Sequence, residues 1–555
     1  MDGFSVSDIN EIYDIDRLKT LFVSYVEETE KIIEQEKRKA REYADLYDWL
    51  LEQLRQLKRD RFGKKSESIF NLQISLFEDE KKDDETNRKE KLIEVAPHCR
   101  KIKTRADFSN LEKEVFHHDL QDKNCPKCSN PLSELKPTIK EVIRYEKGRY
   151  VLEEHIIHNY VCNKFSAVSQ ASMYSGENYH KLIDSSIVSP SLMASIIDDK
   201  FTRALPLYRQ EQDLARNGIS INRQNMSNWL SVIAQNYIGF LTQLMNRDLL
   251  EEDIIYGDET TLNCLEFKDR SKSYIWVRCS SPSSTRQIRL FDFSRGRDFE
   301  SCKKLYEGYK GYLHCDAYAT YRRLEGVTIV ACMAHARRYV FEAISTSKLY
   351  ILYEKLPDGE SRRSFLNEHE SFRILIDLLS MIDDLFKLER GYKAQKLDHE
   401  AIRQSRLEQA KPILEKIRTC IDMYKDSYLK KSKAGEAMTY LDSNYDQLCN
   451  YLLDGRLELT NSLAERTIKN VVIGRKNFLF ANTNQGAVDA CMYYSLIETA
   501  KANGLNPYRY VKYILEKMIN VKFDDEEFLR SLLPYSDSLP RELRSAAKTA
   551  DSIKE

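Results

Sequence analysis

The sequence predicts a multidomain α/β protein built around a mixed β-sheet with helices packed against it. One reason is length, because 555 residues exceed what a single hydrophobic core supports. A second reason lies between residues 253 and 335, where three β-rich runs are followed by strands that alternate with helices. The segments on both sides of that region are charged and mostly helical in pattern, which places the sheet in the middle of the chain.

The first 94 residues are expected to hold helices and a linker. Residues 1–70 are predicted to be a helical or coiled-coil region, because large apolar side chains alternate in steps of four and three. These positions are Tyr43, Tyr47, Leu50, Leu54 and Leu57. The same spacing also suits a helix that packs within its own domain. Residues 78–91 contain no apolar side chain, so residues 71–94 are predicted to be a charged linker.

Two candidate binding modules follow the linker. The sequence CPKC has the spacing of a metal half-site, so residues 95–175 are expected to hold a metal ion through Cys125 and Cys128. Residues 176–248 are predicted to be helical, with a turn at Asn217-Gly218 that gives the proportions of a helix-turn-helix or of an ordinary helical hairpin. In a helix-turn-helix, the side chains available to base edges are Arg223, Gln224, Asn225 and Asn228.

Residues 249–345 carry the strand pattern of the central sheet. The five β-rich runs are DIIYGDETTLNCLEF (253–267), SKSYIWVRCS (271–280), RQIRLFDFS (286–294), GYLHCDAY (311–318) and VTIVACMAH (327–335). A helical run, RDFESCKKLYEGY, separates the third strand from the fourth. This order of strands and helices is that of the ribonuclease-H-like fold.

Three acids are the candidate catalytic residues. Asp258 ends the apolar opening of the first strand and Asp316 ends the fourth, and these two strands can lie side by side in a mixed sheet. Two carboxylates so placed repel each other unless a divalent cation neutralises them. Each Asp alone also suits a turn or a helix cap. Glu465 is the candidate third ligand, although Ser462 and Glu465 also have the spacing of a helix capping box.

Basic residues near these acids are candidate DNA contacts. Arg466, Lys469, Arg475 and Lys476 lie in the same stretch as Asn477, Phe478 and Phe480, a mixture suited to phosphate contacts and base stacking. Arg337 and Arg338 either contact phosphate or form a solvated helix face. The nearby Cys332 and His335 have C-x-x-H spacing, which fits a packed structural pair better than a metal site.

Several blocks together resemble one known family. GDET (257–260), GYLHCDAY (311–318), CMAHARR (332–338), NSLAERTIKNVVIGRKNFLF (461–480) and SLIETAKANG (495–504) are similar to successive blocks of the insertion-sequence-66 transposase family. FGKKSES (62–68), CPKC (125–128) and the region of Trp229 occur in the family's order as well, so the resemblance covers nearly the whole chain.

The resemblance implies an Asp-Asp-Glu transposase with a ribonuclease-H-like core. Asp258 and Asp316 match the two Asp positions and Glu465 the Glu position, with Glu498 as the alternative third acid. The core then comprises residues 249–345 and 456–490, with a helical insertion at 346–455 and a C-terminal helical region at 491–555.

The chemistry that follows is metal-dependent cleavage and joining of DNA. The three acids would hold two Mg²⁺ or Mn²⁺ ions, which activate a water or a DNA 3′-OH and stabilise the leaving oxygen. The expected partners are double-stranded DNA, namely the terminal inverted repeats of the element and target DNA, further copies of the chain bound to that DNA, and small accessory proteins of the same element.

The resemblance also bears on the metal module. It places a second pair of cysteines near YVCNKF, where this sequence has Cys162 but Phe165 in place of a fourth Cys. His158 or His155 would then complete a zinc site with Cys125, Cys128 and Cys162. The module would be zinc-ribbon-like.

Alternatives from other classes are a domesticated or catalytically inactive copy that acts as a DNA-binding repressor, and a structure-specific nuclease. A net charge of -1 neither requires nor excludes a polyanionic partner. The chain has no apolar stretch of the roughly 20 residues that span a membrane, and its acidic start is unlike a signal peptide. We therefore expect a cytoplasmic protein that is associated with the nucleoid when it is bound to DNA.

Overall fold

The computed structural model describes most of the chain from residue 112 onward. The described residues are 22–26, 29–31, 33–34, 36–37, 112–124, 131–146, 148–161, 173–184, 186–268, 272–357, 359–519 and 525–545. Several predictions lie outside them: the heptad positions 43–57, the linker at 71–94, and Cys125, Cys128, Cys162 and Phe165. The chain divides into two compact units, and each is described by itself.

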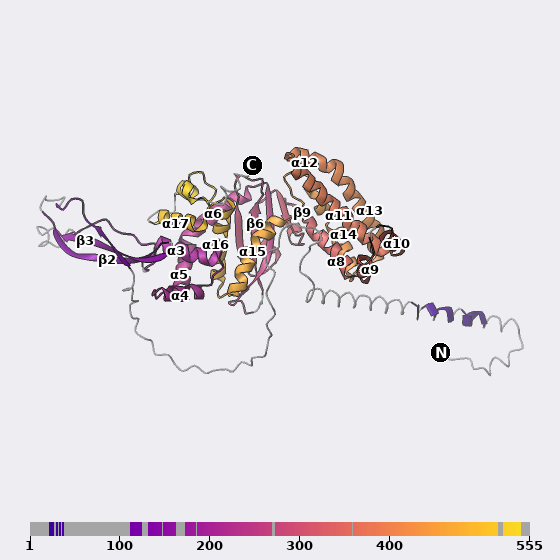
Figure 1. Cartoon of the computed structure of the whole chain (residues 1–555), viewed down its shortest axis with the longest axis horizontal. Coiled ribbons are helices and arrows are strands. Elements are labelled where there is room, and N and C mark those ends of the chain that lie inside the picture. Colours follow the sequence, from indigo (N-terminus) through magenta and orange to yellow (C-terminus); the bar gives the residue numbers. More distant parts are fainter. Residues whose placement is uncertain are drawn as a thin grey trace, which may run out of the picture. The chain divides into compact units, whose positions relative to one another are not determined.

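The prediction of a multidomain, mixed α/β protein is confirmed. The larger unit comprises residues 98–332, 397–404 and 446–555, and it contains two sheets with helices (Figure 1). Its first sheet consists of β1 (Glu112–His118), β2 (Ser133–Glu146), β3 (Arg149–Val161) and β4 (Met173–Ser175). Strand β3 is central, with β1 parallel to it and both β2 and β4 antiparallel to it.

A group of helices follows the first sheet. Its α-helices are α3 (Pro190–Ile197), α4 (Leu207–Arg216), α5 (Arg223–Ile233) and α6 (Gly239–Leu250), and a π-helical turn, η1 (Asp198–Thr202), extends α3. Helices α4 and α5 are separated by a turn in which Gly218 has a φ of 77°, a conformation that glycine adopts without strain. The side chain of Asn222 caps α5 by accepting a hydrogen bond from the backbone N–H of Asn225. The predicted helix, turn and helix are confirmed.

The central sheet has six strands. They are β5 (Ile254–Cys264), β6 (Ser273–Ser280), β7 (Arg289–Ser294), β8 (Tyr312–Cys315), β9 (Thr328–Ala331) and β10 (Phe480–Ala481). The order is β7-β6-β5-β8-β9, with β10 paired to the far end of β5. The first three strands are antiparallel, whereas β5, β8 and β9 are parallel. The predicted pairing of the first and fourth strands is therefore confirmed.

Helices from the C-terminal part of the chain pack on this sheet and on other helices. Between β7 and β8 lies α7 (Phe299–Leu305), and the C-terminal part supplies α15 (Ser462–Phe478), α16 (Asn484–Ala502), α17 (Pro507–Met518) and α18 (Glu526–Ser531). Helix α15 contacts β5 and β6, and α16 packs along β7. Ser495 and Thr499 of α16 exchange hydrogen bonds with the backbone of Phe291 and Arg289, so α16 covers the unpaired edge of β7.

The smaller unit is helical, as predicted for the region after residue 346. Its elements in the described part are α8 (Met333–Thr346), α9 (Lys348–Glu354), α10 (Glu360–Glu368), α11 (Glu370–Ala394), α13 (Lys411–Tyr424) and the greater part of α14 (Lys433–Cys449). The short helix α12 (His399–Ser405) precedes α13. Buried Arg406 pairs with Glu389, with 2.8 Å between Nε and Oε1, which compensates the buried charge.

Among the described residues, no helix is both long enough and apolar enough to cross a membrane.

Candidate active site

The first acid of the site follows a buried stretch of β5. Ile254, Ile255, Tyr256 and Gly257 are buried, and Asp258 comes directly after them. Gly257 leaves room for a close neighbour, because a Cβ at this position would lie 2.5 Å from the hydroxyl of Tyr306. Neighbouring residues of a strand point to opposite faces, so Asp258 and Glu259 project on the two sides of the sheet.

The second acid lies beyond the end of β8. The last pair of the β5–β8 ladder joins Tyr256 and His314, and Asp258 and Asp316 each come two residues later. Parallel register therefore brings Asp316 to the level of Asp258, just beyond the end of β8, where its charge acts on both Asp258 and Glu259. Asp316 accepts a hydrogen bond of 2.9 Å from the backbone N–H of Tyr318, and Ala317 between them has a φ of 64°. This tight turn orients the Asp316 carboxylate.

The third acid lies in the first turn of α15. Asn461 is the N-cap residue but makes no side-chain cap hydrogen bond, and Ser462 is already helical, so the capping box considered for Ser462 and Glu465 does not form. The side-chain N–H of Asn461 instead donates to the carbonyl of Gly257 at 2.8 Å, and its backbone N–H donates to Sγ of Cys332 at 3.2 Å. These two bonds fix the start of α15 beside the residue that precedes Asp258.

The charges of Asp316 and Glu465 both act on Asp258, the first of the three predicted acids. Burial raises the pKa of Asp258 to about 8, and the charges of Glu259, Asp316 and Glu465 act in the same direction. A carboxylate oxygen of Glu465 also lies within 4.8 Å of Sγ of Cys332. Such a group of half-buried, mutually repelling carboxylate oxygens suits a hard divalent cation.

The alternative third acid, Glu498, faces other partners. It lies in α16, where its two carboxylate oxygens accept hydrogen bonds from Asn470, at 2.7 Å, and from Lys501, at 2.8 Å. Its charge is not among the influences that raise the pKa of Asp258. The geometry therefore favours Glu465 over Glu498 as a partner of the two Asp residues.

Arg297, Glu259, Tyr318 and Tyr321 surround the acids and were not anticipated from the sequence. Arg297 forms ion pairs with Glu259 and Asp316 and lies over the ring of Tyr318. The hydroxyl of Tyr321 donates to Glu259 at 2.5 Å. The only available signal was the adjacency of Glu259 to Asp258 in GDET, since Arg297 belongs to a loop without a spacing pattern.

Comparison with protein-family models identifies the family of this chain. The model described as Transposase IS66 family matches residues 185–489, which is more than half of the chain and includes all three acids. The chain belongs to the IS66 transposase family. Two further models, described as IS66 C-terminal element and as Transposase C of IS166 homeodomain, match residues 495–535 and 49–112.

Similar proteins of Sinorhizobium fredii carry no assigned function. Uncharacterized protein y4jD is 24% identical over 454 residues, which cover 77% of this chain and 81% of that protein. Uncharacterized protein y4hP is 24% identical over 407 residues, which cover 70% of this chain and 69% of that protein. The similarity therefore extends over most of the IS66 family protein described here.

The basic residues of α15 in this IS66 family member divide into two groups. Arg466, Lys469 and Lys476 are exposed. Arg475 is half-buried, and its guanidinium donates to the side-chain oxygens of Thr260, at 3.1 Å, and Thr261, at 2.9 Å. This side chain therefore attaches α15 to β5.

The polar and aromatic residues that follow Arg475 also differ in their contacts and exposure. Asn477 donates to the carbonyl of Ala204 at 3.0 Å, and Phe478 packs under the ammonium of Lys200, 4.3 Å from the ring centre. Phe480 in β10 is 43% exposed, and the neighbouring Leu479 is 62% exposed. Of the two aromatic residues proposed for base stacking, Phe480 is thus the more accessible.

The remaining basic candidates lie in the helical unit. Arg337 in α8 is half-buried and pairs with Asp383, with 2.6 Å between Nε and Oδ1, so it stabilises the contact of α8 with α11. Arg338 is exposed. His335 lies in the first turn of α8.

The four candidate base-reading side chains all lie at the start of α5. Arg223, Gln224, Asn225 and Asn228 are exposed, and Gln224 donates to Asn228 at 3.0 Å. Buried Met226, Leu230 and Ile233 form the opposite face of the helix. This amphipathic arrangement leaves a polar helix face open for a partner.

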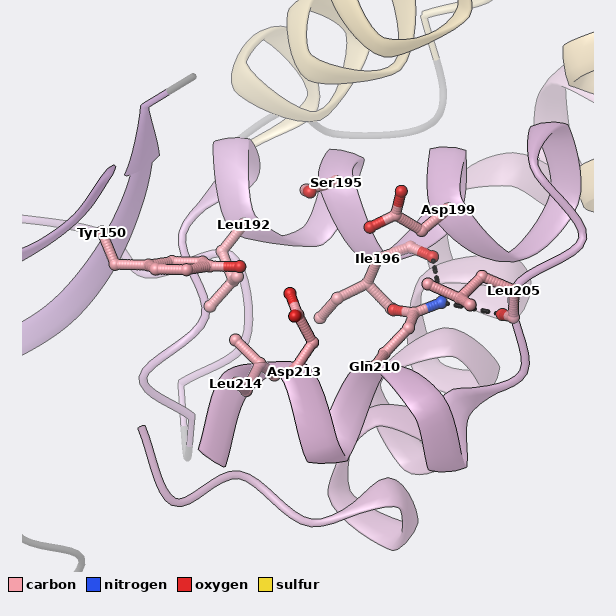
Figure 2. Close-up of a pocket in the computed structure, with 9 residues that line it drawn as sticks. All are labelled: Tyr150, Leu192, Ser195, Ile196, Asp199, Leu205, Gln210, Asp213 and Leu214. Carbon is pink, nitrogen blue, oxygen red and sulfur yellow. Dashed lines mark hydrogen bonds between the residues drawn. The ribbon is translucent and has the colours of Figure 1, made fainter. Parts of the chain in front are cut away.

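A pocket between β3, α3 and α4 is lined in part by two acidic side chains, Asp199 and Asp213. Figure 2 shows the side chains of Tyr150, Asp199 and Asp213 around it, and Gln210 donates to the carbonyl of Leu205 at 3.1 Å. Burial raises the pKa of Asp199. Acidic lining does not suit phosphate, so the exposed face of α5 is the better DNA-binding candidate in this module.

The two histidines considered as zinc ligands lie on β3. His158 Nε2 is 2.9 Å from His117 Nδ1, and His155 Nδ1 is 3.1 Å from His118 Nε2. His155 is also stacked on Tyr179 with 3.5 Å between ring centres and is buried, whereas His158 is half-buried. Of the two, His158 is the more accessible to a ligand.

Proposed function

We propose that this chain is the transposase of an insertion sequence, which binds the terminal inverted repeats of its element, cuts them and joins them to target DNA. The observation that carries the proposal is the convergence of Asp258, Asp316 and Glu465 from β5, the end of β8 and the start of α15. The strand order β7-β6-β5-β8-β9 supports a ribonuclease-H-like core, because its three antiparallel strands are followed by two parallel ones.

The donor set suits Mg²⁺ or Mn²⁺. The ligands are carboxylate oxygens, which hard cations prefer. The pKa of Asp258 is raised first by burial and further by the charges of Glu259, Asp316 and Glu465, and a bound cation would offset both effects. Asp258, Asp316 and Glu465 would hold the ions. When bound, such ions supply Lewis-acid activation of an attacking hydroxyl and stabilisation of the leaving oxygen.

The residues of the chain would supply orientation and charge around that site. The Ala317 turn and the hydrogen bond from Tyr318 fix the direction of the Asp316 carboxylate, and Asn461 fixes the start of the helix that bears Glu465. Arg466, Lys469 and Lys476 on the same helix would hold the DNA backbone near the acids.

DNA recognition is assigned to other parts of the chain. The exposed start of α5 would contact base edges, with Arg223, Gln224, Asn225 and Asn228 as the contacts. The match of residues 49–112 to a homeodomain model supports a further DNA contact in that region.

We further propose that the protein acts as a homo-oligomer on DNA with accessory proteins of its element. We also propose that Cys125, Cys128, Cys162 and His158 bind zinc, which a measurement of the metal content of the purified chain tests.

The deciding experiment is incubation of the full chain with Mg²⁺ and linear DNA that bears the element ends and their flanking sequence. Nicks at the element ends should appear with the wild-type protein, and Asp258→Asn or Asp316→Asn should abolish them while leaving DNA binding intact. Glu465→Gln should do the same, whereas Glu498→Gln should retain cleavage.

Each contrary result would identify a different error. Cleavage by either Asp variant would remove the catalytic assignment. Binding without nicks in the wild-type protein would favour the alternative of a DNA-binding repressor derived from such an element.

A further inference from the structure

One guanidinium lies among the acids of the site. Arg297 belongs to the loop between β7 and α7, two residues before α7 begins. Its Nη2 forms an ion pair with Glu259 and lies 3.4 Å from Oδ2 of Asp316. The guanidinium carbon is 3.5 Å from the centre of the Tyr318 ring. Arg297 therefore has three different attachments, one of which is a candidate metal ligand.

Two of these attachments are fixed by further contacts. The side chain of Glu259 is only 3% exposed, and its second oxygen accepts the hydroxyl of Tyr321 at 2.5 Å. Tyr318, whose ring underlies the guanidinium, donates its hydroxyl to the backbone carbonyl of Arg297 at 2.9 Å. Glu259 and Tyr318 thus hold Arg297 from the interior of the protein.

The third attachment is the looser one. Asp316 is 27% exposed, and its 3.4 Å separation from Arg297 lies at the long limit of a hydrogen bond. The carboxylate keeps a separate anchor in the backbone N–H of Tyr318. Asp316 can therefore exchange Arg297 for another cation without disturbing the rest of the cluster.

We propose that Arg297 is a positioning residue that serves as the internal counter-ion of Asp316. Before a divalent cation binds, Arg297 neutralises this carboxylate and holds it in the site, and the incoming cation has to compete with the guanidinium for it. Glu259 is then the anchor of Arg297 and not a metal ligand. This inference rests on the proposed function, since it concerns the same acids.

The proposed competition predicts a change in affinity for a divalent ion that is opposite to the change expected from damage to the site. Removing the positive charge removes both the competitor and the repulsion of an incoming cation, so the affinity for a divalent ion should rise. A variant that only damaged the site would bind the ion more weakly. The direction of the change therefore separates the two explanations.

The test is a titration of the full chain with Mn²⁺ in the absence of DNA, with free Mn²⁺ measured by electron paramagnetic resonance. Arg297→Gln should bind Mn²⁺ roughly tenfold more tightly than the wild type, given the partial exposure of the pair. The matched control is Arg295→Gln, because Arg295 lies in the same loop and packs over Phe267, 5.1 Å from its ring centre. This control should bind Mn²⁺ like the wild type.

Unchanged or weaker binding by Arg297→Gln would overturn the inference, and so would an equal gain in the Arg295→Gln control. If Arg297→Gln does not fold, Arg297→Lys takes its place, because lysine lacks the planar guanidinium that contacts Glu259 and Asp316 while it stacks on the ring of Tyr318. Arg297→Lys should then bind Mn²⁺ about threefold more tightly than the wild type, and equal or weaker binding would overturn the inference.

Failure of the proposed function has a different signature. If the double variant Asp258→Asn and Asp316→Asn binds Mn²⁺ as well as the wild type, the acids are not the metal site, and the assignment of the site itself is wrong.

Discussion

At the scale of single residues, the site combines groups that are unfavourable by themselves. Asp258 is a half-buried carboxyl beside other acids, and Ala317 has a backbone conformation that residues with a Cβ rarely adopt. Both features lie where β5 passes the end of β8. Each has a thermodynamic cost that substitution can reveal.

The buried charge of Asp258 predicts a more stable variant. The folded-state pKa of about 8 lies above the value of 3.8 for an unperturbed Asp, so ionisation destabilises the metal-free fold increasingly as the pH rises through this interval. Asp258→Asn should raise the free energy of unfolding in the presence of a chelator by on the order of a few kcal/mol near pH 8. Denaturant unfolding at pH 5 and pH 8 measures it, and the gain should be smaller at pH 5.

The turn at Ala317 predicts a second stabilising substitution. A φ of 64° costs an alanine about 1 kcal/mol more than a glycine. Ala317→Gly should therefore stabilise the protein by about 0.5–1 kcal/mol in denaturant unfolding. Ala331→Gly is the control, because Ala331 lies in regular strand β9 and should lose stability. Equal effects at both positions would contradict the argument from φ.

At the scale of elements, the two sides of α15 differ, because one is attached to β5 and the other is exposed. Asn461 and Arg475 attach the helix to β5 at its two ends, while Arg466, Lys469 and Lys476 are exposed. The helix thereby places Glu465 beside Asp258 and leaves a basic surface next to the acids.

This division predicts that substitution of two neighbouring basic residues affects different properties, namely stability for one and DNA binding for the other. Arg475→Ala should lower the free energy of unfolding by about 1–3 kcal/mol, because it removes the hydrogen bonds to Thr260 and Thr261. Lys476→Ala should change stability by less than about 0.5 kcal/mol and weaken DNA binding instead. Thermal unfolding and a DNA titration of both variants compare them. A loss of stability in Lys476→Ala would show that its side chain is also structural.

The strands and the candidate acids could be predicted from the sequence because each depends on a local pattern. Runs of β-branched and aromatic residues marked the strands, and each Asp follows such a run. Arg297 was not accessible, since its role depends on contacts with Glu259 and Tyr318 that no spacing encodes. The capping-box alternative for Glu465 was equally undecidable, because α15 begins at Ser462 and its N-cap residue, Asn461, bonds to Gly257, 204 residues away, which no local pattern encodes.

At the scale of the whole molecule, attraction to DNA depends on where charges lie. The net charge of -1 gives the chain no general affinity for a polyanion, so binding must come from local clusters such as the exposed residues of α5 and α15.

Salt dependence tests this distribution of charge. DNA affinity should fall steeply between about 50 and 200 mM salt, because phosphate contacts release counterions. Lys469→Ala should reduce the slope of the logarithm of affinity against the logarithm of salt concentration by about 1. Asp258→Asn should leave the slope unchanged, because this residue does not contact phosphate through a positive charge. An unchanged slope in Lys469→Ala would remove this residue from the DNA contacts.

The attachment of Asn461 to Cys332 across 129 residues also has a consequence for biosynthesis. On the ribosome, Asp258 and Asp316 emerge first, and the whole helical unit is made before Glu465 appears. A nascent or prematurely terminated chain therefore contains two of the acids and α5 but lacks the third acid. Under the proposed function such a product could not cut DNA, and it would also lack α16, to which Ser231 and Leu230 of α5 are hydrogen-bonded.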